Sequence, residues 1–156
     1  MTPQQIEAIV REYIEQVIHM SFATVKDNKP WVCELHFYYD EELNLYFTSS
    51  KKTRHAQELL ANPHVAGNIV TQHFKNQKVR CVEFEGTAEI LDGIEAEEAA
   101  YKAYVARYGE SEGLLNEIRK DSDVYMFKIK VQNFFLFDSY GDARGKHYLP
   151  WKGTEQ

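Results

Sequence analysis

Leu45–Pro63, which reads LYFTSSKKTRHAQELLANP, places a strand, a polar turn and a short helix in immediate succession. Leu45–Phe47 are residues that favour strands, and the hydroxyl residues Thr48–Ser50 interrupt the strand and offer a helix N-cap. Ala56–Ala61 favours a helix, and the Asn-Pro pair that follows should end it. We take this strand–turn–helix unit as the point from which the rest of the chain can be placed.

The turn within this unit is basic, although the chain as a whole carries a net charge of −6. Lys51, Lys52 and Arg54 lie within four positions at the start of the expected helix. A helix N-terminus carries partial positive charge, so cations there are unfavourable unless an anion binds to them and to the free N–H groups. The pattern therefore predicts a phosphate site, and the alternative is a solvated basic turn.

Length and composition indicate one globular domain spanning residues 1–156. The chain is 44% hydrophobic and 13% aromatic, which excludes disorder and favours a β-rich fold. Its acidic balance argues against a nucleic-acid partner, which needs a basic face. Cys33 and Cys81 form no CxxC pair and indicate reduced thiols. The N-terminus is not of the signal-peptide type and no run is apolar enough to cross a membrane, so we expect a cytoplasmic protein.

Periodicity predicts about seven strands and three helices, joined mainly as hairpins rather than βαβ units. An antiparallel sheet closed into a small barrel fits this order, because closure removes exposed edges. The expected helices cover residues 3–18, Ala56–Ala61 and residues 95–108, with one further turn near Leu114–Ile118. The expected strands are His19–Val25, Pro30–Tyr39, Leu43–Thr48, His64–Gln72, Lys78–Leu91, Asp123–Val131 and Asn133–Ser139, followed by an irregular tail over residues 141–156.

Motifs for catalysis or metal binding are absent from the sequence. The six histidines are not spaced as metal ligands, so we predict no metal site. Neither a GxSxG nor a Walker A sequence occurs. Glu83 and Glu85 share one strand face, which is typical of a wet surface more than of an acid–base pair. The catalytic residues are therefore unknown at this stage.

The order of elements from Ser21 to Val70 resembles the pyridoxamine 5′-phosphate oxidase-like FMN-binding split barrels. The shared features are a short-loop hairpin, an Asp turn, a strand that ends in Phe-Thr, the basic turn and Leu-x-x-Asn-Pro. Phe84–Glu89 is similar to the Glu-Gly-x-Ala strand of that superfamily. Within it, Lys52–Gln57, Val65–Gly67 and the closing Gly-Thr-Glu-Gln look most like the small YhbP group.

The resemblance implies a mainly β fold, an antiparallel split β-barrel of about six to seven strands with three peripheral helices. It also implies FMN as the cofactor, held between the subunits of a homodimer. The Ser-Arg-Lys phosphate signature of these proteins falls on Thr53, Arg54 and His55, with the lysine replaced by histidine. The implied cofactor-binding residues are Cys33, Glu34, Leu35 and His36 beside the flavin ring, and Thr48, Ser49, Lys52, Thr53, Arg54 and His55 around the phosphate.

Two further departures from the pattern bear on function. Arg80 or Cys81 stands where these proteins often have a glutamine that contacts the flavin. Arg144, Lys146 and His147 are similar in kind, but not in spacing, to the Arg-x-His that grips substrate in the oxidase proper; Trp151 could stack on a ring or anchor the tail.

The resemblance thus predicts an FMN-binding protein with flavin-dependent oxidoreductase activity on an unknown small-molecule substrate. His36 and His147 are the first candidates for a catalytic base. Two alternatives stay open. One is a flavin-free split barrel that serves as a ligand-binding, sensing or interaction module, and the other is a relative that binds haem or a deazaflavin.

Overall fold

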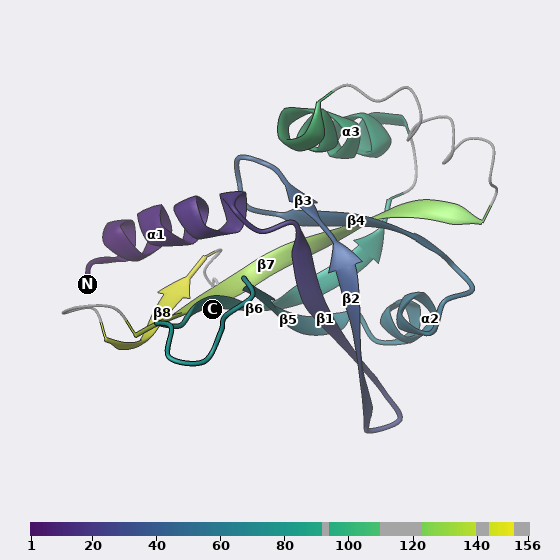
Figure 1. Ribbon diagram of the computed structural model, residues 1–156. Coiled ribbons are helices and arrows are strands. Elements are labelled where there is room, and N and C mark those ends of the chain that lie inside the picture. Colours follow the sequence, from purple (N-terminus) through teal and green to yellow (C-terminus); the bar gives the residue numbers. More distant parts are fainter. Residues whose placement is uncertain (92–93, 110–122, 140–143, 152–156) are drawn as a thin grey trace.

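The computed structural model describes residues 1–91, 94–109, 123–139 and 144–151. Within them the chain forms three helices and eight strands, arranged as in Figure 1. The helices are α1 (Pro3–Glu15), α2 (Arg54–Ala61) and α3 (Ile94–Tyr108). The strands are β1 (His19–Lys26), β2 (Lys29–His36), β3 (Tyr38–Tyr39), β4 (Leu45–Ser50), β5 (His64–Val70), β6 (Arg80–Ile90), β7 (Val124–Asp138) and β8 (Gly145–Pro150).

All strands belong to one antiparallel sheet in the order β2-β1-β5-β6-β7-β4-β3, with β8 added to β7. β4 pairs with residues 124–129 of β7, and β8 pairs with residues 133–138 of the same edge. The mainly β, antiparallel class with three peripheral helices is therefore confirmed, and the eight described strands exceed the predicted six to seven.

The two ends of the sheet are joined by a single residue. β2 and β3 stand at opposite ends of the strand order, yet only Phe37 separates them in sequence. The sheet must therefore curl far enough to bring the end of β2 to the start of β3, and it forms the half-barrel of Figure 1. The Phe37 ring is fully buried and its N–H donates to the carbonyl of Ile18 at 3.1 Å. The prediction of one strand over Pro30–Tyr39 was wrong at this junction.

The C-terminal part of the sheet also differs from the prediction. One 15-residue strand, β7, replaces the two strands predicted over Asp123–Val131 and Asn133–Ser139. Glu85 pairs with Asn133 and Gly86 with Val131, so Gln132 is an extra residue that forms a bulge. The tail predicted as irregular contains β8, which pairs with the part of the β7 edge that β4 does not reach, residues 133–138. The expected turn near residues 114–118 lies outside the described residues.

Two hydrophobic clusters hold the helices to the sheet. The main cluster fills the inside of the curl and includes the apolar faces of α1 and α2. A smaller cluster lies between α3 and the opposite face of β3, β4 and β7, and consists of Tyr38, Tyr46, Leu91, Ala100, Ala103 and Met126. Figure 1 shows α3 above β3 and β4, on its own side of the sheet.

Arg107 ties α3 to α1. Its side chain is only 5% exposed, and its guanidinium donates to the carbonyl of Ile14 at 3.1 Å and to that of Val17. Ile14 belongs to the last turn of α1 and Val17 lies just beyond it, at the end of the helix that carries partial negative charge. A cation from α3 thus caps a helix whose own last turn has no basic residue.

Candidate functional site

The predicted strand–turn–helix unit is present, and it positions the candidate phosphate site. β4 ends at Ser50, and Thr53 is the N-cap of α2. The Thr53 hydroxyl donates to the carbonyl of Ser50 at 2.9 Å and accepts from the N–H of Ala56. The N–H groups of Arg54 and His55, in the first turn, have no acceptor within the helix by its geometry. They are the donors that an anion could use.

Four of the predicted residues meet beneath this helix N-terminus. The imidazole Nε2 of His55 lies 2.8 Å from the hydroxyl of Ser49 and 3.1 Å from that of Thr53. Its Nδ1 lies 3.5 Å from the sulfur of Cys33 on β2. We refer to Cys33, Ser49, Thr53 and His55 as the hydroxyl–imidazole cluster.

The burial of this cluster sets the positions of its protons. His55 is 9% exposed, and burial lowers its pKa, so the ring is neutral at pH 7. Burial, with the nearby Glu34 carboxylate, raises the pKa of the Cys33 thiol. Because the thiol keeps its proton, we assign Cys33 as donor to Nδ1 and the Nε2–H of His55 as donor to Ser49. The Ser49 hydroxyl itself donates to the carbonyl of Ser50 at 3.4 Å and lies 3.1 Å from the Thr53 hydroxyl, so a ligand oxygen that took its proton would replace one of these contacts.

Arg54 is held to one side of this cluster. Its Nε donates to the carboxylate of Glu58 at 2.8 Å, and its guanidinium lies 4.3 Å from the centre of the Trp31 ring. Glu58 is nearly buried and also accepts from the Thr24 hydroxyl at 2.6 Å. The hydrogen bond from Thr24, and after it that from Arg54, lowers the pKa of the Glu58 carboxyl. The i, i+4 spacing of Arg54 and Glu58 was a signal that the sequence analysis did not use.

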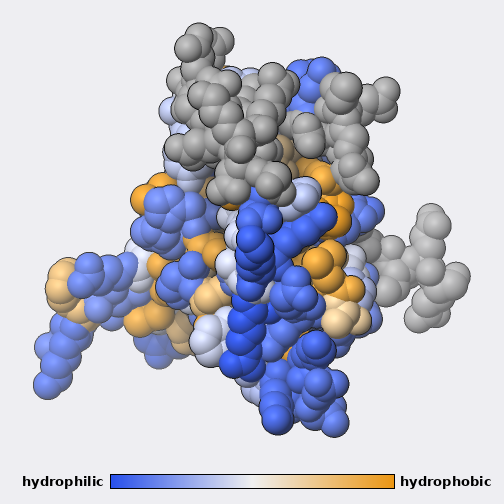
Figure 2. Space-filling view, turned by 90° about the vertical axis from the view of Figure 1, so that its right-hand side faces the viewer, coloured by the Kyte–Doolittle hydropathy of each residue, from blue (hydrophilic) through white to orange (hydrophobic). Residues whose placement is uncertain are grey.

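The two lysines lie on the solvent side of the turn. Lys52 pairs with Asp123, and the ammonium of Lys51 lies 3.8 Å from the centre of the Tyr125 ring. The Lys52 side chain is 77% exposed, and an ion pair that is so open to water contributes little to stability. Figure 2 views this side of the molecule, where hydrophobic areas are interspersed with hydrophilic ones.

The remaining predicted residues do not join the cluster. Thr48 faces away from Ser49, because neighbouring residues of a strand point to opposite faces. It lines a separate cavity with His36 beneath α3. The Glu34 carboxylate accepts from Ser21 on the exposed face of β2, and Leu35 packs against the main core. The predicted site is thus divided between the two faces of the sheet.

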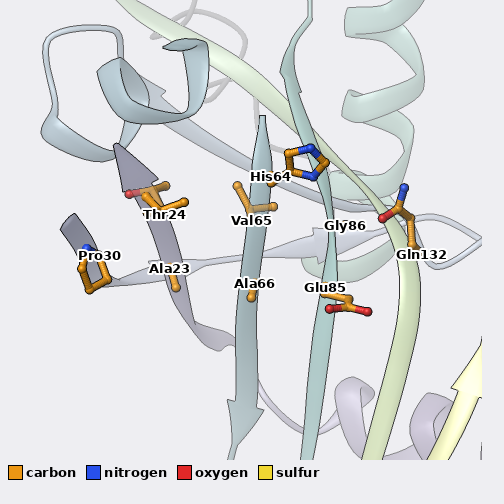
Figure 3. A pocket seen from close by; sticks show the side chains of 10 residues that line it. Ala23, Thr24, Pro30, His64, Val65, Ala66, Glu85, Gly86 and Gln132 are labelled. Atoms are coloured by element: carbon orange, nitrogen blue, oxygen red, sulfur yellow. The ribbon is translucent and has the colours of Figure 1, made fainter. Parts of the chain in front are cut away.

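A second hollow, of about 320 Å³, lies over β1, β5 and β6 and is shown in Figure 3. Ala23, Ala66 and Glu85 lie side by side across these three strands, and small side chains leave the surface open. Gly86 belongs to its lining, and a Cβ there would come within 2.2 Å of the Lys130 carbonyl oxygen. None of the predicted site residues lines this hollow, whereas Gln132, the extra residue of the β7 bulge, does.

The C-terminal residues divide between anchoring and sheet pairing. Trp151 donates from its ring N–H to the carbonyl of Glu42 at 2.6 Å and packs edge-on against Phe134, so it anchors the tail. His147 lies in β8 opposite Leu136, whereas His36 ends β2. The His36 ring instead packs against that of His19, with 4.3 Å between ring centres and 56° between the ring planes.

The described residues contain neither a helix able to cross a membrane nor a cluster of metal ligands. The helices there include none that is long and apolar enough to cross a membrane. The same residues contain no group of three or more His, Cys, Asp or Glu side chains that could hold a metal ion. Both cysteines are free thiols.

Solved structures of low sequence identity share the fold. Campylobacter jejuni ChuZ has a TM-score of 0.76 at 15% identity, covering 96% of this chain and 61% of its own. HutZ, the heme storage protein of Vibrio cholerae, has a TM-score of 0.69 at 20% identity, covering 85% and 93%. A putative pyridoxamine 5′-phosphate oxidase from Listeria innocua has a TM-score of 0.65 at 19% identity, covering 86% and 99%.

The sequence itself matches known proteins over most of its length. A UPF0306 protein of Yersinia pseudotuberculosis is 26% identical over 101 residues, which are 64% of this chain and 68% of the relative. The family model described as pyridoxamine 5′-phosphate oxidase matches residues 6–138. With the half-barrel sheet and the basic turn before α2, this match shows that the chain belongs to the pyridoxamine 5′-phosphate oxidase family.

Proposed function

We propose that this protein binds FMN, with the phosphate at the N-terminus of α2 and the cofactor held between two copies of the chain. The observation that carries the proposal is the Ser49 hydroxyl, which His55 orients at a helix N-terminus. The first-turn N–H groups and the exposed ammonium of Lys52 would complete an anion site. Arg54 would add charge from one side while it remains paired with Glu58.

The residues present fit a phosphate better than they fit a metal ion. Hydroxyl and N–H donors point to an anion, and the neutral His55 is engaged on both ring nitrogens. Bound flavin would supply electron-transfer chemistry, while the chain binds and orients it. We infer that the activity, if the cofactor is retained, is that of a flavin-dependent oxidoreductase.

The outer face of the sheet supports a homodimer. Tyr148 is 53% exposed, Val32 58% and Phe137 37%, and by strand alternation all three lie on the face away from the main core. Glu83 and Lys146 form an ion pair on the same face. Apolar side chains with paired charges among them suit the interface between two copies of the chain.

The alternative is a flavin-free module that binds another ligand. The pairing of Arg54 with Glu58 favours this alternative, because the charge of Arg54 is already balanced by a carboxylate. The neutral His55, in place of a lysine, removes a further charge. That HutZ, a heme storage protein, shares the fold indicates that such sheets suit more than one cofactor.

The test is an absorbance spectrum of the purified protein before and after FMN is added and the excess removed by gel filtration. A retained flavin spectrum, near one per subunit in a dimer, is expected. A colourless dimer that retains no FMN would favour the alternative.

Two matched variants locate the phosphate. Arg54→Ala should weaken FMN binding by about 2 kcal/mol, which is roughly thirtyfold. Arg11→Ala is the control, because Arg11 also pairs at 2.8 Å with a glutamate one turn away but belongs to α1. Equal FMN affinity in the two variants would remove the basic turn from the site.

A further inference from the structure

His19 and His36 stand opposite each other in the β1–β2 hairpin, at the end where β2 leads through Phe37 into β3. Residues that are directly opposite in an antiparallel pair have their side chains on the same face of the sheet. The two imidazole rings accordingly pack together, with 4.3 Å between ring centres and 56° between ring planes. Both residues are exposed, so the pair presents two imidazoles to solvent.

The separation of the two rings is close to that of imidazoles that share a metal ion. An imidazole nitrogen binds a transition-metal ion at about 2.0 Å, which places the ion about 3.2 Å from the ring centre. Two rings that bind at right angles, as neighbouring ligands do in a tetragonal Cu²⁺ or Ni²⁺ site, then have their centres about 4.5 Å apart. The observed 4.3 Å is near this value, so both side chains can reach one ion while the backbone stays in place.

The backbone holds the two histidines in a fixed register. Eight residue pairs join β1 to β2, and His19 with His36 is the pair nearest to β3. Directly beyond it the N–H of Phe37 donates to the carbonyl of Ile18 at 3.1 Å. Phe37 and Met20, which are the next residues along the two strands, are fully buried. The two imidazoles are thus brought together before any ion binds, which lowers the entropic cost of binding.

Glu34 adds negative charge beside the pair. It lies two residues before His36 on the same face of β2, and its carboxylate accepts a hydrogen bond from the hydroxyl of Ser21, two residues after His19. A carboxylate next to a metal site attracts the cation and can accept hydrogen bonds from its bound water. The net charge of the chain, −6, acts in the same direction.

We propose that His19 and His36 together bind one divalent transition-metal ion, with water in the remaining coordination positions. Imidazole suits Cu²⁺, Ni²⁺ and Zn²⁺, and Cu²⁺ has the highest affinity in the series of divalent first-row ions. The described residues contain no group of three or more side chains that could hold a metal ion, so the protein supplies two ligands. Histidine spacing along the chain does not reveal this pair, because the register of the hairpin brings the two residues together.

Titration calorimetry of the untagged chain with Ni²⁺ measures the site, since Ni²⁺ does not oxidise the free thiols of Cys33 and Cys81. We expect one Ni²⁺ per chain and no binding of Mg²⁺, which prefers oxygen ligands. His19→Gln and His36→Gln should each weaken Ni²⁺ binding by at least about thirtyfold, because even changes outside the coordination sphere cost roughly ten- to a hundredfold. Electron paramagnetic resonance with Cu²⁺ should show two bound imidazoles in the unchanged protein and one in either variant.

His64→Gln is the matched control, because His64 is an exposed histidine on the same face of the sheet but stands opposite Thr87. It should bind Ni²⁺ as the unchanged protein does, and all three variants should melt as the unchanged protein does without metal, since they alter exposed side chains. Equal loss of affinity in the three variants would overturn the inference and indicate an adventitious ion only. Full affinity in both His19→Gln and His36→Gln would also overturn it. Binding of Ni²⁺ by protein that retains no FMN would support it even if the proposed function fails.

Discussion

Acidification should destabilise the folded protein through His55, and the variant His55→Gln should remove this effect. The imidazole is buried and its pKa is lowered from 6.5, so the folded state resists a proton that the unfolded state accepts. The contribution of His55 to stability is therefore complete above about pH 6.5 and is lost as the pH falls from there toward the folded-state pKa. Glutamine keeps an N–H donor for Ser49 but does not titrate in this range.

The size of the effect follows from one proton. The slope of the free energy of unfolding against pH cannot exceed about 1.4 kcal/mol per unit for a single group. At pH 5.5, one unit below the unfolded value, the loss is at most about 1.4 kcal/mol, or about 4 °C in melting temperature for a chain of this size. At pH 8 it is zero.

Urea unfolding, followed by tryptophan fluorescence, measures this difference between pH 5.5 and pH 8. The quantity to compare is the change with pH in the unchanged protein minus that in His55→Gln, which cancels the other titrating groups. An identical pH dependence in the two proteins would refute the reasoning, because it would mean that His55 protonates as readily in the folded state as in the unfolded one.

Three other predictions test individual contacts that hold the sheet and its helices together. Gly86→Ala should cost about 3 kcal/mol in urea unfolding, because its Cβ would lie 2.2 Å from the fixed carbonyl oxygen of Lys130. Arg107→Met should cost about 2 kcal/mol in the same assay, since the α1 carbonyls lose a buried charged donor. Thr24→Val should raise the pKa of the Glu58 carboxyl toward its usual range, read by carbon NMR, and an unchanged pKa would contradict the assigned bond.

Local signals predicted the start of the chain correctly. Thr2 and Gln5 form the capping box of α1. The predicted cap of α2 among Thr48–Ser50 was wrong, because these residues continue β4 and the cap is Thr53. Asp27 and Asn28 adopt positive φ values of 52° and 58°, as expected for a two-residue hairpin turn between β1 and β2. The capping box and the hairpin turn depend only on neighbouring residues, so the sequence alone predicts both of them.

The breaks in the sheet were not predictable in the same way. Alternation of side chains runs through Phe37 without interruption, because its ring is buried whether β2 and β3 are one strand or two. The boundary between β2 and β3 is marked by a change of partner: β2 pairs with β1, whereas Tyr38 pairs with Tyr46 of β4. β8 was missed for a related reason, since Gly145–Pro150 alternates weakly and becomes a strand through its partner β7.

The predicted cofactor-binding residues are divided in space. Cys33, Ser49, Thr53 and His55 lie together, although the resemblance put Cys33 beside the flavin ring and the other three around the phosphate. The inclusion of Thr48 beside Ser49 neglected the two-residue period of a strand. The pairing of Thr24 with the α2 carboxylate joins residues 34 positions apart, and local sequence carries no trace of it.

The one-residue connection at Phe37 joins the two end strands of the sheet, β2 and β3, through the backbone. Phe37 links the β1–β2 hairpin directly to the β3–β4 hairpin. Once both hairpins have formed, the two end strands of the sheet are therefore already connected. Ring closure then needs no additional search by distant segments, and its entropic cost is that of local loops. The slow, long-range steps left to folding are the pairing of β5 with β1 and the docking of β7 onto β6 and β4, each across more than thirty intervening residues.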